Sequence, residues 1–97
     1  MISPSWMKVW WIAYNNKLFD GDLPMPGFRV KDLDYCGEYD SESIVLSSYL
    51  SSANEAKATL LHEMVHQWQH LHNKPLDHGH EFQTWRDLIL SATNLEI

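Results

Sequence analysis

The sequence predicts an α+β domain that contains an N-terminal helix, a short antiparallel sheet, a central helix and a C-terminal helix. Apolar residues recur at helical spacing near both ends, and the run 53–71 contains neither Gly nor Pro, which indicates three helices. Residues 28–46 include short segments typical of strands. We expect one domain over residues 1–97, because 97 residues with 44% hydrophobic content suit a single small core. Residues 91–97 are expected to fray.

The N-terminal helix is predicted to begin near Ser3-Pro4-Ser5 and to end near Phe19. Its apolar residues follow the i, i+3, i+4 pattern. A face that packs against the central helix explains this pattern better than a base-stacking surface, because basic residues do not alternate with the aromatic ones. Residues 20–27, which hold two Gly and two Pro, then form a loop. The residues predicted on the packing face are Trp6, Val9, Trp10, Ile12, Ala13, Tyr14 and Leu18.

Three short strands are predicted between this loop and the central helix. They cover residues 28–33, 35–39 and 42–46, and the last two are joined by a turn near Asp40-Ser41. Such short connections suit antiparallel neighbours, so an antiparallel sheet is the simplest arrangement.

The central helix is predicted over residues 53–71. Ser52 begins a Ser-x-x-Glu box that ends at Glu55, which is typical of a helix N-cap, and Asn73-Lys74-Pro75 supplies the stop. One face of this helix is apolar and is expected to pack in the core. The residues on that face are Leu60, Leu61, Met64, Val65, Trp68 and Leu71.

The opposite face of the central helix carries a His-Glu-x-x-His pattern, formed by His62, Glu63 and His66. On a helix, the two histidines lie about 40° apart around the axis and about 6 Å apart along it. They can therefore bind one zinc ion from the same side. Glu63 flanks the ion without binding it, which is the position of a general base for a metal-activated water.

A catalytic zinc usually has three protein ligands and leaves the fourth position to water. Residues 75–80 are predicted to form a turn, and residues 81–90 a helix that folds back toward the central one. This fold brings His78, His80 or Glu81 within reach of the metal. Spacing alone favours a histidine over Glu81 and leaves all three open.

Three other polar residues near this pattern are expected to have no direct role in metal binding. His70 lies two turns beyond His62, so we expect it to be exposed to solvent. His72 falls on the packing side of the helix. Asp77 is expected to shape the turn, although a carboxylate there could also orient a ligand imidazole. Candidates for a second donor to an oxyanion are Tyr35, Tyr39 and His80.

The net charge of −6 argues against an autonomous nucleic-acid surface, because the seven Lys and Arg residues are scattered. We therefore expect any contact with DNA to be weak or indirect. No apolar run approaches eighteen residues, so we expect no membrane partner. Cys36 is the single cysteine, which is compatible with a reducing compartment, and a soluble cytoplasmic protein is the expected class.

Three segments together resemble the SprT-like metalloprotease family, which includes the Spartan-type DNA–protein crosslink proteases. They are Leu-Phe-Asp-Gly-Asp-Leu-Pro at 18–24, Leu-Leu-His-Glu-Met-Val-His at 60–66 and His-Gly-His-Glu-Phe at 78–82. Residues 43–47 are also similar to the strand that precedes the family's metal helix. The resemblance covers roughly residues 14–90, and the combination of segments is more specific than any one of them.

The resemblance implies a small zincin-like domain in which zinc is bound by His62, His66 and His78, with Glu63 as the general base. It implies that Phe82 packs and fixes the turn that carries His78, whereas His80 occupies a variable position. The expected activity is hydrolysis of peptide bonds in a protein substrate, which could be a DNA-associated protein. The sequence contains no cysteine-rich zinc ribbon and no basic tail, so we expect a minimal catalytic domain.

Two other classes of function remain open at this point. One is a zinc-stabilised binding module without proteolytic activity. Structural zinc sites normally have four protein ligands, so participation of His80 as a fourth ligand would indicate this class. The other is a metal-free helical interaction protein whose histidines fall at this spacing by coincidence.

Overall fold

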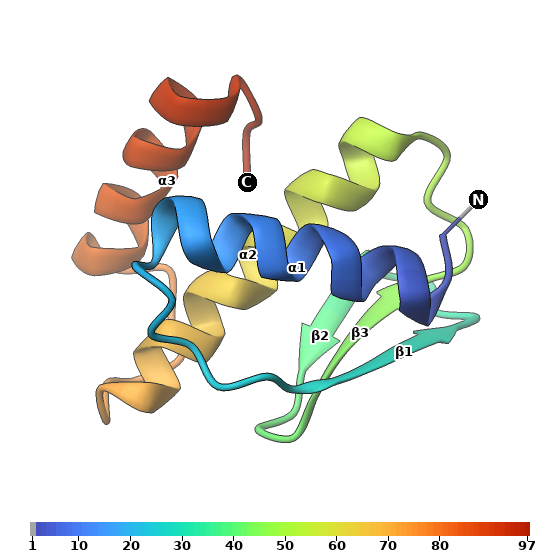
Figure 1. Cartoon of the computed structure of the whole chain (residues 1–97), viewed down its shortest axis with the longest axis horizontal. Coiled ribbons are helices and arrows are strands. Elements are labelled where there is room, and N and C mark those ends of the chain that lie inside the picture. The colour runs from blue at the N-terminus through green and yellow to red at the C-terminus, as the bar shows by residue number, and fades with distance from the viewer. Residues whose placement is uncertain (1) are drawn as a thin grey trace.

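Three helices and a three-stranded sheet make up the computed structural model, which describes residues 2–97 (Figure 1). The α+β class is confirmed. None of the helices in the described part of the chain is long and apolar enough to cross a membrane. In chain order the elements are α1 (Pro4–Leu18), β1 (Gly27–Lys31), β2 (Gly37–Tyr39), β3 (Ser43–Ser47), α2 (Ala53–Leu71) and α3 (His80–Thr93).

The sheet is mixed, so the prediction of an antiparallel sheet is wrong for β1. The strand order is β1-β3-β2, and β3 pairs parallel with β1 and antiparallel with β2. In the register, Ile44 of β3 lies opposite both Phe28 and Tyr39. The physical reason is the composition of β3: its consecutive apolar residues are fully buried, which requires a central position, whereas the shorter β2 lies at the edge.

Helix α2 begins and ends where the sequence predicts. The Ser52 hydroxyl accepts a hydrogen bond from the Glu55 N–H at 3.1 Å, which confirms the N-cap. Leu60, Leu61, Met64 and Val65 have no exposed surface. Leu71 is exposed, contrary to the prediction: it is the last residue of α2, and the residues that directly follow it in the turn are exposed as well.

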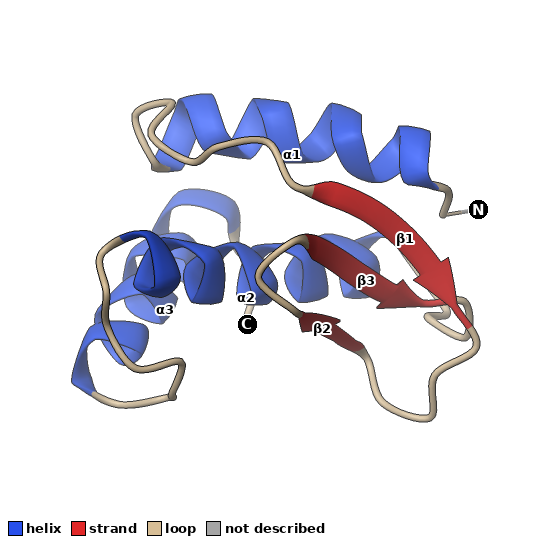
Figure 2. Cartoon of the chain, turned by 90° about the horizontal axis from the view of Figure 1, so that it is seen from below, coloured by secondary structure: helices blue, strands red, loops and turns tan. Residues whose placement is uncertain are grey.

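Helix α1 lies along α2 and β1 (Figure 2), and its buried face agrees with the predicted one only in part. Tyr14 is buried as predicted, and Trp6, Trp10 and Leu18 are partly buried against the core. Met7, Trp11 and Tyr14 are buried, whereas Val9 is 66% exposed and Ile12 is also exposed. The helix has apolar residues on several sides, so its periodicity fits more than one face. Contacts with other elements select the face that is buried: Trp11 packs edge-on against Phe28 and donates a hydrogen bond from Nε1 to Gln67 of α2.

The C-terminal segment is folded, so the prediction that residues 91–97 fray is wrong. Helix α3 continues to Thr93, and Asn94 ends it in the left-handed conformation with φ of 63°. The chain then turns back toward α2 (Figure 1), where Leu95 and Ile97 pack against the core. Apolar side chains at these two positions provide the reason, since their burial opposes fraying.

Candidate metal centre

Three histidines converge beside α2. His62 and His66 lie on the helix and are partly buried, whereas His78 lies in the exposed turn between α2 and α3. Their ligand atoms all lie within 4.8 Å of one another, and Nε2 of His62 is 3.2 Å from Nε2 of His78. Two nitrogens bound to one zinc ion at tetrahedral angles are about 3.4 Å apart. The three imidazoles therefore lie close enough together to bind one metal ion.

The turn that carries His78 is shaped by side chains on both sides of it. Asp77 accepts a hydrogen bond at its Oδ1 from the Gly79 N–H at 3.1 Å, so this residue acts as the turn-forming Asp that the sequence predicts. The carbonyl of His78 accepts a hydrogen bond from Nε2 of Gln83 at 3.1 Å. These bonds hold the backbone of the third histidine even though its side chain is exposed.

Phe82 packs against all three imidazoles. It is buried in the first turn of α3, and its ring centroid lies 4.8 Å from that of His62, 5.2 Å from that of His66 and 4.6 Å from that of His78. The buried aromatic ring is thus in contact with each of the three imidazoles and packs the cluster on one side. The prediction that Phe82 is a packing residue beside the turn is confirmed.

Burial keeps the two helical imidazoles neutral, which is the form that binds metal. It lowers the pKa of His62 from 6.5 to about 4, although a hydrogen bond to the Ile97 carbonyl acts in the opposite direction. Burial also lowers the pKa of His66, and a hydrogen bond to Gln69 opposes that shift. Both nitrogens that face the cluster are thus available as ligands at neutral pH.

The remote nitrogens of these two histidines have their own acceptors. Nδ1 of His66 lies 2.7 Å from Oε1 of Gln69, and Nδ1 of His62 lies 3.4 Å from the Ile97 carbonyl oxygen. Such contacts orient a metal-binding imidazole and leave its Nε2 free for the metal. Sequence reasoning missed both partners. For Gln69 the signal was present, because an amide three residues after a helical histidine lies within reach of it.

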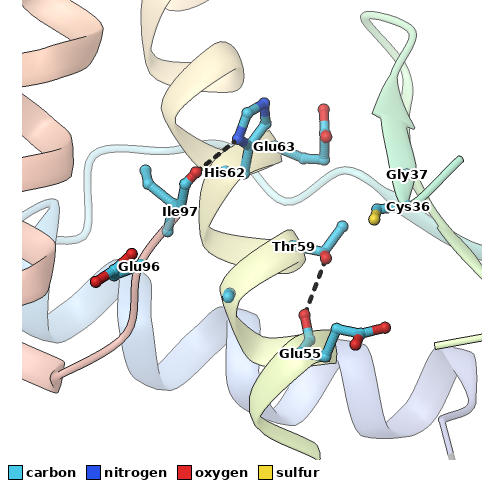
Figure 3. Close-up of a pocket in the computed structure, with 9 residues that line it drawn as sticks. Cys36, Gly37, Glu55, Thr59, His62, Glu63, Glu96 and Ile97 are labelled. Atoms are coloured by element: carbon cyan, nitrogen blue, oxygen red, sulfur yellow. Dashed lines mark hydrogen bonds between the residues drawn. The ribbon is translucent and has the colours of Figure 1, made fainter. Parts of the chain in front are cut away.

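Glu63 is buried beside the cluster, with 5% of its surface exposed. Burial, and to a smaller extent the negative charge of Glu38 on β2, raise the pKa of its carboxyl group from 4.5 to about 7. Its side chain projects from α2 between the helix and the end of β2 (Figure 3). The carboxyl group is therefore next to the cluster without being one of its ligands.

A pocket of about 340 Å³ opens directly onto His62 and Glu63 (Figure 3). Gly37 of β2 forms part of the opposite wall, together with the adjacent Cys36. A Cβ atom at Gly37 would lie 2.7 Å from the Val45 carbonyl oxygen and 2.9 Å from Thr59 Cγ2. Only glycine therefore lets β2 approach α2 this closely, which fixes the width of the pocket. The other lining residues are Glu55, Ala58, Thr59, Glu96 and Ile97.

The two alternative ligands lie outside the cluster. His80 is exposed at the start of α3, and Glu81 forms a salt bridge with Lys74 in which the Glu81 Oε1 to Lys74 Nζ distance is 2.9 Å. Among the residues that the structure describes, the histidine cluster contains His62, His66 and His78. The fold therefore brings His78, rather than His80 or Glu81, to the helical pair.

The remaining polar candidates have other contacts. Nδ1 of His70 lies 2.8 Å from the Tyr39 hydroxyl oxygen, so this exposed histidine is linked to β2. His72 lies against the ring of Trp68 with 4.6 Å between centroids, but it is exposed. The hydroxyl of Tyr35 donates a hydrogen bond to Glu38.

The arrangement described so far is that of a three-histidine metal site with a buried carboxyl group beside an open pocket. The model of the SprT-like family matches residues 9–97, so the chain belongs to this family. Members of that family are, in general, zinc metalloproteases. The corresponding searches gave no match among curated proteins and none among solved structures.

Proposed function

We propose that this protein is a zincin-like zinc metalloprotease that hydrolyses peptide bonds. The observation that carries the proposal is the placement of the buried Glu63 beside His62 on the wall of the pocket, where a carbonyl group and a water molecule could meet. Membership of the SprT-like family supports a metallopeptidase-type activity. The donor set of three imidazoles fits zinc in a catalytic rather than a closed structural site.

In this proposal, His62, His66 and His78 bind the metal and Glu63 moves the proton. A zinc ion held by these three residues would supply Lewis acidity, which polarises a substrate carbonyl group and makes a water molecule more acidic. Glu63 accepts a proton from the attacking water and returns it to the leaving amine. A carboxyl group whose pKa is about 7 before metal binds can do both near neutral pH, because neither protonation state is strongly favoured.

An extended segment of a protein is the substrate that the site favours. The strand β2 lies at the edge of the sheet and contributes Gly37 to the pocket, so a peptide could align with this edge while its carbonyl group faces Glu63. The net charge of −6 favours a protein over nucleic acid as the direct partner. We therefore propose that any action on DNA-associated proteins depends on contacts with the protein component.

The decisive experiment compares Glu63→Gln with the unchanged protein, both purified without a histidine tag and loaded with zinc. The variant should keep its zinc, measured by elemental analysis, and should remain folded, measured by a cooperative thermal transition. Its cleavage of casein should fall by at least about 100-fold, since removal of a general base has effects of that size.

Glu96→Gln is the matched control, because Glu96 lines the same pocket but is exposed and lies on the C-terminal segment. It should cleave casein at nearly the original rate. If Glu63→Gln retains that rate, or if the unchanged protein holds zinc but cleaves nothing, the proposed protease function is wrong. The second result would favour a zinc-stabilised binding module.

A further inference from the structure

Gln69 is a buried polar residue that the proposed proton transfer does not use. It lies on α2 three residues after His66, and 1% of its surface is exposed. A buried amide is costly unless its polar atoms have hydrogen-bond partners. Both ends of this amide have one: Oε1 lies 2.7 Å from Nδ1 of His66, and Nε2 donates to the Asp77 carbonyl oxygen at 3.0 Å.

The orientation of this amide follows from chemistry. The Asp77 carbonyl oxygen can only accept a hydrogen bond, so the NH₂ group of Gln69 must face it. Oε1 then faces His66, and because Oε1 can only accept, Nδ1 of His66 must carry the hydrogen. A neutral imidazole protonated at Nδ1 has its free lone pair on Nε2. The hydrogen bonds thus select the tautomer of His66 whose Nε2 can bind metal.

The same side chain also holds the third histidine. Asp77 directly precedes His78, so the bond from Gln69 to the Asp77 carbonyl connects α2 to the backbone that carries His78. The backbone carbonyl of Gln69 also accepts a hydrogen bond from the Lys74 N–H at 2.8 Å, near the start of the turn. Gln69 therefore contacts His66 on the helix and also the backbone segment that carries His78 in the turn.

We propose that Gln69 is a positioning residue of the metal centre, which fixes the tautomer of His66 and the position of His78 together. This inference rests on the proposed metal centre and assigns no catalytic step to Gln69. It predicts that loss of the amide weakens metal binding through two ligands at once, although Gln69 itself does not touch the metal.

The test compares Gln69→Met with Gln67→Met. Gln67 is a matched control, because it is also buried on α2, with 3% exposed, accepts a hydrogen bond from Trp11 and donates one to the Pro24 carbonyl. Both variants should lose thermal stability in excess chelator. Only Gln69→Met should lose zinc affinity, by about 10- to 100-fold in competition with a chromophoric chelator, whereas Gln67→Met should change it by less than about threefold.

A second measurement does not require the variant to fold. Nitrogen NMR of the unchanged, metal-free protein at neutral pH should show His66 protonated at Nδ1. The Nε2-protonated tautomer at His66, or equal losses of zinc affinity in the two variants, would overturn the proposal. Since the tautomer is measured without metal, a protein that fails to bind zinc would contradict the proposed function, while the tautomer of His66 would still support or overturn the role of Gln69.

Discussion

Helix α2 and the turn at residues 72–79 both contribute to the same histidine cluster, but they hold their residues in different ways. His62 and His66 are placed by the regular hydrogen bonds of a helix whose opposite face is fully buried at Leu60, Leu61, Met64 and Val65. His78 is exposed, and its backbone is held by side chains that reach in from the two flanking helices, namely Gln69 through Asp77 and Gln83 directly. Two of the proposed ligands thus have local support and the third depends on tertiary contacts, so we expect the turn to be the part most sensitive to metal.

Among the tests of this difference between α2 and the turn, removal of metal should have the largest effect on stability. Zinc at about 1,000 times its Kd adds about 4 kcal/mol to the stability of a folded protein that binds it. Chelation should then lower the melting temperature by roughly 20 °C for a domain of this size. Amide hydrogen exchange should increase more at residues 72–79 than at residues 53–61, since only the turn needs the metal to hold it.

Addition of zinc to the chelated protein should restore both measurements. An unchanged melting temperature, or equal acceleration of exchange in the two segments, would contradict the proposed difference between the helix and the turn.

The next effect concerns the two histidines near the turn. His78→Ala should lower zinc affinity by at least about 100-fold, because even the loss of a residue that orients a ligand costs 10- to 100-fold. His80→Ala is the control and should change the affinity by less than about threefold, since His80 lies outside the cluster. Isothermal titration of each variant with zinc measures both values. Equal losses of zinc affinity in the two variants, or a loss from His80→Ala alone, would contradict the assignment of His78 as the third ligand.

The buried groups of α2 should give the metal-free protein a characteristic pH dependence. The pKa of Glu63 is raised from 4.5 to about 7 on folding, so the stability that it contributes is present below pH 4.5 and is lost as pH rises through 7. The pKa of His62 is lowered from 6.5 to about 4, so its contribution is present above pH 6.5 and is lost as pH falls toward 4. The two effects oppose each other between pH 4.5 and 6.5.

Glu63→Gln separates these two contributions. In excess chelator, the variant should gain stability relative to the unchanged protein by up to about 3 kcal/mol as pH rises from 5 to 8, because only the unchanged protein must ionise a buried carboxyl group. Urea denaturation at the two pH values measures the gain. Parallel stability curves for the two proteins would show that the carboxyl group is not buried as described.

The smallest expected effect tests the local support of α2. Ser52→Ala removes the N-cap acceptor of the Glu55 N–H and should lower the free energy of unfolding by about 1 kcal/mol. Zinc affinity measured in the folded protein should stay the same, because the cap lies at the opposite end of the helix from the turn. Ser51→Ala is the control and should cost less than about 0.5 kcal/mol, because it keeps the Ser52 cap and removes only an exposed hydrogen bond of 3.3 Å from the Ser51 hydroxyl to the Glu55 carboxylate. A large loss of zinc affinity in Ser52→Ala would contradict the view that the N-terminal cap of α2 supports the helix without affecting the histidine cluster.

The sequence predictions that failed concern the packing face of α1 and the pairing of β1, and both failures have the same cause. Val9 and Ile12 of α1 were wrongly assigned to the packing face, because they match the helical period as well as Met7 and Trp11 do. The parallel pairing of β1 with β3 depends on which strand takes the centre of the sheet. In both cases the sequence permits several arrangements, and contacts with distant residues select one.

The sequence by itself determined the features that arise from contacts within a few residues: the limits of α2, its Ser52 cap and the spacing of His62, Glu63 and His66 on one side of it. Helical geometry repeats every 3.6 residues, so such features can be read directly from the order of residues. Spacing alone left open which histidine near the turn joins the pair, and the family resemblance pointed to His78. Only the tertiary structure decided which strand is central, and that Ile97 and Gln69 contact the remote nitrogens of His62 and His66. These outcomes depend on how whole elements pack, which the burial of apolar surface across the domain decides.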